Sequence, residues 1–200
     1  MPALTTAQRI RATVGVAVIF GTWFYLVFTR PTDWESVGGS SPALITLGGY
    51  VFGAILLLSA SLPILPARTI AIIPAALVLN IVIGQIVGSV GIPLYLDSVG
   101  TVLVAGLAGP IAGLATGTLS SIVWGLFNPA ALPFAAVSAM VGLLSGVMIA
   151  KGMLRNIPLT ITAGVVLGVI SGMLAAPVAA FVYGGTAGVG TGALVSLFRE

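Results

Sequence analysis

The chain has 200 residues, of which 58% are hydrophobic and only 6% are charged, and its formal net charge is +3. So few polar groups cannot cover a water-soluble domain of this size, which predicts an integral membrane protein. The absence of cysteine and histidine excludes thiolate redox chemistry, soft-metal sites and imidazole acid–base catalysis. The small positive charge does not indicate a nucleic-acid partner, because the basic residues flank apolar runs, as loop charges that set membrane orientation do.

The fold class follows from the residue types inside the apolar runs. The chain contains 27 glycines and 12 prolines. Such residues weaken helices in water, but in membranes small residues allow close helix packing, and neighbouring helices tolerate proline kinks. The alternating pattern of a membrane β-barrel is absent. We therefore expect an all-α polytopic membrane helical bundle.

Seven apolar runs divide the chain. The third run has 24 residues and would be about 36 Å long, enough to cross a hydrocarbon core of about 30 Å. The fourth run has a dozen residues, about 18 Å, and is predicted to be a short helix shielded by its neighbours. The expected runs are Thr13 to Phe28, Ala43 to Leu65, Thr69 to Ile92, Ser98 to Gly109, Ile111 to Phe127, Ala131 to Ala150, and a last run that begins at Ile157.

The last apolar run can be interpreted in two ways. A helix break near Pro177 would give eight spans, whereas one long span to Tyr183 followed by a glycine-rich re-entrant loop would give seven. The basic residues place the N-terminus on the cytoplasmic side by the positive-inside rule. This orientation puts the corner at Asp97 and the corner at Asn128 together at the outer face. The residues that set it are Arg9, Arg11, Arg68, Lys151 and Arg155.

Small residues recur at four-residue spacing in three of the runs. Residues four apart lie on one helix face, so each series offers a strip that another backbone can approach. We interpret these strips mainly as intramolecular packing surfaces, and Asn80 as an interhelical hydrogen bonder. The strips are Gly109, Gly113 and Gly117; Gly142 and Gly146; and Gly164, Gly168 and Gly172.

Asp97 is the only acidic residue between Glu35 and Glu200. Aspartate at the centre of a membrane helix costs about 2.5–3.5 kcal/mol, so a single one is expected to be functional, paired or near water. Ligand pockets are mostly apolar with a few converging polar groups. The candidate ligand-binding residues at the outer level are Gln85, Tyr95, Asp97, Ser98, Trp124, Asn128 and Tyr183.

Each main candidate also has a structural alternative. Asp97 can cap the short helix that begins at Ser98, a common role for aspartate. Tyr95 and Trp124 can serve as interfacial anchors instead of ligand contacts. As a ligand group, the carboxylate would suit a cationic amine or the N–H groups of a heterocycle, and the aromatic rings would supply stacking or cation–π contacts.

An enzymatic function is not expected. No second carboxylate lies near Asp97, and no cysteine or histidine is present to complete a triad or a metal cluster. The phosphate-binding pattern G-x-x-x-x-G-K-[ST] is also missing, so any use of ATP would belong to a partner. We therefore predict no catalytic residues, no metal and no cofactor.

Two elements carry a family resemblance, P-L-Y-L-D-S-V-G-T from Pro93 and A-G-P-I-A-G from Ala108, followed by F-N-P and G-G-T-A-G-V-G in the expected order. The region from Thr69 to Arg199 resembles the S components of energy-coupling factor (ECF) vitamin transporters. The resemblance implies a six-helix core, residues 67–200, that captures a vitamin-like small molecule at the outer face of the cell membrane. Residues 1–66 would add an N-terminal transmembrane hairpin, which departs from that pattern.

The resemblance also implies partners. An S component docks on a transmembrane T component driven by two cytoplasmic ATPases, and alanine pairs on its first core helix form the docking face, which carries over to Ala71 and Ala75 here. The chain stops soon after its glycine-rich element, a second departure from relatives that continue further. Two alternatives remain open: a sensor or scaffold of the same fold that does not transport, and a self-contained secondary carrier.

Overall fold

The computed structural model describes residues 4–31, 34, 39–90 and 96–183. Every regular element in this part of the chain is a helix. Five of the helical segments are long and apolar enough to cross a membrane, so the structure is that of an all-α membrane protein. The expected fold class is confirmed.

Two helices form the N-terminal hairpin, α1 (Thr6–Thr29) and α2 (Ser41–Ser61), and the short 3₁₀ helix η2 (Leu62–Ile64) follows. The predicted start of α1 at Thr13 is wrong by seven residues. The helix starts earlier because Thr5 and Gln8 form a capping box, each bonded to the other's backbone N–H. Ser40 caps α2 by accepting a hydrogen bond from the backbone N–H of Ala43.

The next three helices are α3 (Ala67–Val90), α4 (Val99–Ala108) and α5 (Pro110–Gly125). The prediction of a short fourth helix is confirmed, since α4 has 10 residues. Gly109 separates α4 from α5 with φ 85° and ψ 176°, a backbone conformation that is essentially restricted to glycine. Pro110 then starts α5 at a position where its missing N–H costs nothing.

The chain continues with the 3₁₀ helix η3 (Pro129–Phe134), α6 (Ala135–Ala150) and α7 (Ile157–Val182). Pro177 lies inside α7, so of the two interpretations of this run the helix break is wrong and one long helix is confirmed. Membrane helices accept an internal proline where neighbouring groups satisfy the freed carbonyl. The glycine-rich run after Tyr183 lies outside the described residues.

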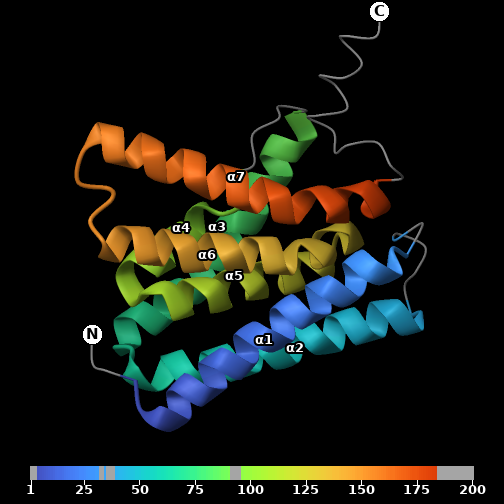
Figure 1. The fold of residues 1–200 in the computed structure, drawn as a ribbon, viewed down its shortest axis with the longest axis horizontal. Helices are drawn as coiled ribbons and strands as arrows, with labels where there is room; N and C mark the ends of the chain where they lie inside the picture. The colour runs from blue at the N-terminus through green and yellow to red at the C-terminus, as the bar shows by residue number, and fades with distance from the viewer. Residues whose placement is uncertain (1–3, 32–33, 35–38, 91–95, 184–200) are drawn as a thin grey trace, which may run out of the picture.

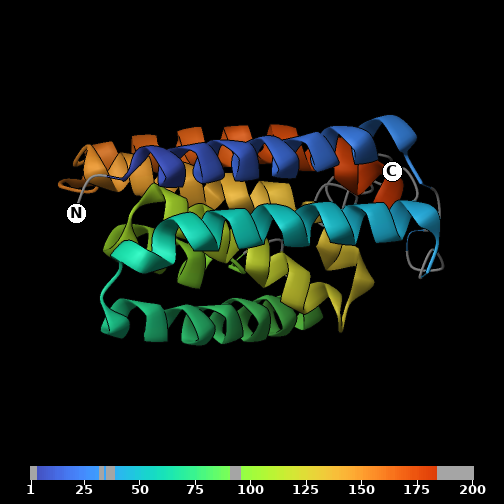
Figure 2. The same cartoon turned by 90° about the horizontal axis from the view of Figure 1, so that it is seen from below.

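The helices lie in layers, and in Figure 1 α7 crosses the direction of α1 and α2 (Figures 1 and 2). Figure 2 shows α3 on one side of the molecule, α2, α4 and α5 in the middle, and α1, α6 and α7 on the opposite side. The hairpin and the later helices share one hydrophobic cluster. Its large buried members include Ile19 and Leu26 of α1, Tyr50 and Leu57 of α2, Leu114 and Ile122 of α5, and Val178 and Phe181 of α7.

The glycines of α5 and α6 hold these two helices in close contact. A β-carbon at Gly142 would overlap the carbonyl group of Gly113, and one at Gly117 would overlap the carbonyl group of Ser138. The predicted intramolecular packing is therefore confirmed for this pair of helices. For α7 the same prediction is wrong within the described residues, because a β-carbon at Gly164, Gly168 or Gly172 would meet no atom within 4 Å.

Candidate functional site

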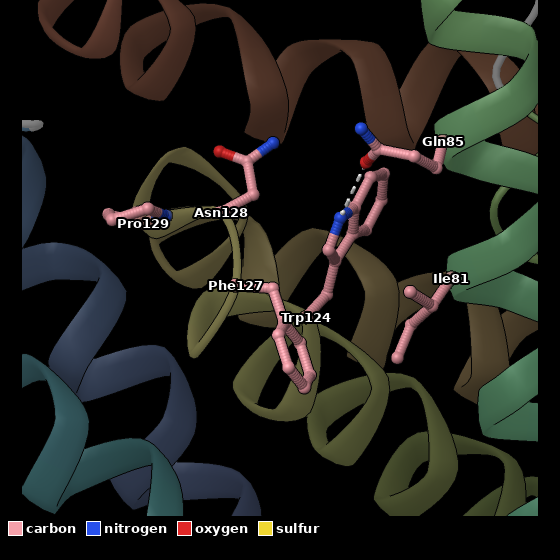
Figure 3. A pocket seen from close by; sticks show the side chains of 6 residues that line it. All are labelled: Ile81, Gln85, Trp124, Phe127, Asn128 and Pro129. Atoms are coloured by element: carbon pink, nitrogen blue, oxygen red, sulfur yellow. Dashed lines mark hydrogen bonds between the residues drawn. The ribbon is translucent and has the colours of Figure 1, made fainter.

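A cavity of about 550 Å³ lies between the second half of α3 and the end of α5. Its wall on α3 consists of Ile81 and Gln85, and its opposite wall consists of Trp124, Phe127, Asn128 and Pro129. Figure 3 shows the indole N–H of Trp124 directed at Gln85, to whose side-chain oxygen it donates a hydrogen bond of 3.3 Å. Three of the seven predicted site residues, Gln85, Trp124 and Asn128, are thus brought together around one cavity.

Asp97 reaches the same point of α3 as the indole ring of Trp124. A β-carbon at Gly84 would lie 2.7 Å from Cη2 of Trp124 and 2.9 Å from Cβ of Asp97. Both side chains therefore pack on the bare backbone of Gly84, and of the two only Trp124 also lines the cavity. Trp124 and Asp97 lie against the same glycine, and Asn128 follows Trp124 by four residues. Their common level in a membrane stays a prediction.

The environment of Asp97 shifts the pKa of its carboxyl group upwards. The residue lies in the turn before α4, outside the candidate membrane spans. Burial raises the pKa of its carboxyl group, and hydrogen bonds from its own backbone and from the Ser98 hydroxyl partly oppose that shift. The Ser98 hydroxyl donates to Oδ1 of Asp97 at 3.4 Å. A cation in the cavity would favour the ionised carboxylate.

Asn80 links three helices beneath this site. Its amide nitrogen donates to the Thr101 hydroxyl at 2.9 Å and to the Ser120 hydroxyl at 3.2 Å, and its oxygen accepts the backbone N–H of Gly100 at 2.7 Å. Asn80 is fully buried, which confirms the prediction of an interhelical hydrogen bonder. The cluster joins α3 to the start of α4 and to α5.

This cluster also corrects one alternative for Asp97. The N-cap residue of α4 is Ser98, and neither it nor Asp97 caps the helix through a side chain. Instead the Asn80 side chain, from another helix, accepts the free N–H of Gly100 in the first turn. The hypothesis that Asp97 caps the short helix is therefore wrong, and its carboxylate is left for another role.

The remaining predicted residues lie elsewhere. Tyr95 lies outside the described residues. Tyr183, at the end of α7, does not line this cavity, and its ring centroid lies 6.2 Å from that of Phe134 in η3. Ala71 and Ala75 are both exposed on α3, on either side of Pro74.

Sequence reasoning missed Gly84 and the apolar lining residues Ile81, Phe127 and Pro129. A signal for Gly84 was present, because Ala76, Asn80 and Gly84 recur at four-residue spacing and therefore share one face of α3. That face meets α4 closely, since a β-carbon at Gly100 would overlap the backbone of Ala76.

The fold and the cavity together define a polytopic helical membrane protein with a mixed apolar and polar pocket near the ends of α3 and α5. Comparison with protein-family models, with curated proteins and with solved structures gave no match for this chain. Chemically, the pocket offers an indole face, two side-chain amides and a nearby carboxylate. This set suits a compact, flat molecule that carries N–H donors or a positive charge.

Proposed function

We propose that this protein is the substrate-capture subunit of an ECF-type importer in the cell membrane. It binds a vitamin-like small molecule at the outer face and passes it on after docking on a T component with two ATPases. The main support is that Asp97 and Trp124 converge on Gly84 beside a cavity of about 550 Å³. The motifs around Asp97 and Gly109, which resemble those of S components, supply the transport part of the proposal.

The chemistry of capture follows from the lining residues. Ile81 and Phe127 provide apolar contacts, and Trp124 provides a flat face for stacking. Gln85 and Asn128 can exchange hydrogen bonds with polar edges of the bound molecule. The Asp97 carboxyl group accepts hydrogen bonds from its own backbone and from Ser98 and can accept more, so it favours a bound molecule with positive charge or N–H donors.

The capture step is tested by identifying the bound molecule and then measuring its affinity for purified variants. Mass spectrometry of small molecules co-purified with the detergent-solubilised protein identifies the compound, which is then titrated against purified variants. We expect Asp97→Asn to weaken its binding about 10-fold or more, because hydrogen bonds to charged groups contribute about 1.5–3 kcal/mol. Trp23→Phe, which alters an indole away from the cavity, is the control. Unchanged affinity in Asp97→Asn would remove Asp97 from the site.

The docking step needs a separate experiment. Ala71→Trp or Ala75→Trp should abolish uptake in cells while leaving binding by the purified protein intact, because both alanines are exposed on α3. Val165→Trp, at an exposed position on α7, is the control for bulk on the surface. Uptake that survives both alanine replacements would exclude this face as the coupling surface. If the unmodified protein binds the molecule but supports no uptake, the sensor or scaffold alternative is favoured.

A further inference from the structure

Two aromatic side chains of the N-terminal hairpin donate hydrogen bonds into η3. The indole N–H of Trp34 donates to the carbonyl oxygen of Pro129 at 2.8 Å. The hydroxyl group of Tyr50 donates to the carbonyl oxygen of Pro133 at 3.3 Å. Trp34 is 3% exposed and Tyr50 is 0% exposed. A buried hydrogen bond of this kind is costly to lose, because the carbonyl would then remain unsatisfied away from water.

The segment that receives these bonds is a short 3₁₀ helix. The helix η3 has only six residues and contains two prolines, which cannot donate through their nitrogen atoms. Helices of the 3₁₀ type are short and have poorer hydrogen-bond geometry than α-helices. The position of η3 therefore depends on contacts with other elements more than that of α5 or α6 does.

This segment continues directly into the wall of the cavity. Pro129 lines the cavity and is also the residue whose carbonyl Trp34 binds. Asn128 lines it as well, and its side chain caps η3 by accepting the backbone N–H of Ala130 at 3.2 Å. A displacement of η3 would thus move both residues relative to Gln85 on the opposite wall.

We propose that the α1–α2 hairpin positions the ligand pocket, and that Trp34 and Tyr50 are the positioning residues that hold the Asn128–Pro129 wall in place. The hairpin is then part of the binding apparatus and is more than an additional membrane anchor. This inference concerns the geometry of the cavity, so it stands or falls independently of which molecule the cavity binds or whether that molecule is transported.

The hairpin supplies a matched control. Trp23 of α1 donates its indole N–H to the carbonyl oxygen of Leu174 at 3.1 Å, and Leu174 lies in α7 and does not line the cavity. Trp23→Phe and Trp34→Phe therefore remove the same kind of donor from the same hairpin. Only the second of these bonds ends on the wall of the cavity.

The experiment uses a nitroxide spin label on the full-length protein in lipid nanodiscs. The chain contains no cysteine, so Phe127→Cys introduces a single attachment point, and Phe127 is 78% exposed at the edge of the cavity. Electron paramagnetic resonance spectra of the label are recorded for the labelled parent and for three variants of it that carry Trp34→Phe, Tyr50→Phe or Trp23→Phe as a second substitution. Thermal unfolding of each variant reports overall stability alongside.

We expect the mobility of the label to increase, relative to the labelled parent, in Trp34→Phe and in Tyr50→Phe, and to stay the same in Trp23→Phe. Tyr50→Phe removes only a hydroxyl group and keeps the buried ring, so it tests the bond even where Trp34→Phe folds poorly. An unchanged spectrum in both Trp34→Phe and Tyr50→Phe would overturn the inference. An equal change in Trp23→Phe would overturn it too, because the effect would then reflect general loosening of the hairpin.

Discussion

The glycine strips of the α5–α6 pair and of α7 have the same sequence pattern but different surroundings. Gly113, Gly117 and Gly142 face backbone atoms of the neighbouring helix, so closely that a β-carbon would overlap them. Gly164 and Gly168 face no described atom within 4 Å. Four-residue spacing of small residues therefore shows where a backbone can approach, and the packing of the whole bundle decides where one does.

The difference also separates two parts of the molecule. The α5–α6 pair forms the centre, with Thr116, Thr118 and Ser145 all buried. In contrast, α7 presents large apolar side chains such as Ile161, Val165 and Met173 on its surface. In a membrane such an apolar surface can face lipid at no cost. Substitutions should therefore be far less tolerated in the centre than on α7.

The largest expected effect tests the centre. Gly142→Ala adds one methyl group where the carbonyl group of Gly113 already lies, and backbone atoms on a packed helix cannot move aside like the end of a side chain. Overpacking typically costs about 1–3 kcal/mol, and we expect a value near the upper end. Denaturant unfolding of the purified protein measures it. A loss that vanishes within error would mean that α5 and α6 are further apart than described.

A second test asks whether hydrogen bonds also hold the centre together. Asn80→Leu leaves the Thr101 hydroxyl and the Gly100 N–H without their partner, and we expect a loss of about 1–2 kcal/mol in the free energy of unfolding. Thr101→Val removes a single bond and should cost less. In the double variant the two losses should not add, since both remove the same bond. If the two losses of stability added fully, the hydrogen bond between Asn80 and Thr101 would be contradicted.

An intermediate case is Gly84, which faces side chains instead of backbone. The methyl group of Gly84→Ala would meet the far end of the Trp124 ring, which can turn aside, and the β-carbon of Asp97, which moves only with its backbone. We expect a loss of stability of about 1 kcal/mol, the low end for overpacking, because one of the two contacts can be relieved. The contribution of Trp124 to the fluorescence emission, obtained as the difference from a matched Trp124→Phe variant, should shift. Unaltered emission would show that Trp124 does not pack on Gly84.

The smallest effect is expected on α7. Gly168→Ala adds a methyl group in open space, so the free energy of unfolding should change by no more than about 0.5 kcal/mol. Any change should favour the folded protein, since alanine has the higher helix propensity. The same unfolding assay as for Gly142→Ala provides the comparison. A loss as large as that of Gly142→Ala would reveal a partner for this strip.

Much of the fold could be predicted because the length of an apolar run and the position of glycine and proline residues determine local structure directly. The short fourth helix followed from the distance between Ser98 and Gly109, and the α4–α5 corner from Gly109 and Pro110. The start of α1 was misplaced because Arg9 and Arg11 interrupt the apolar run, while the capping box that starts the helix comes before them. Pro177 was considered a possible break, but helix packing in a membrane does not require one there.

The candidate site was predicted less completely. The polar members could be proposed because an isolated aspartate, amides and aromatic rings are conspicuous in an apolar chain. The spacing of Ala76, Asn80 and Gly84 places Gly84 on a packed face of α3, but which side chains approach it from other segments depends on the tertiary arrangement. Likewise, the loop before α2 gave no sign that Trp34 would reach Pro129, 95 residues further along the chain.

The buried amide of Asn80 has a mechanical consequence. The amide bonds both to the first turn of α4 and to Ser120 of α5, and Gly100 lies directly on the backbone of Ala76. A force applied to the lipid-facing side of α3 would therefore be transmitted at one point to both helices. It would reach the start of α4, just after Asp97, and α5, which leads into the wall of the cavity.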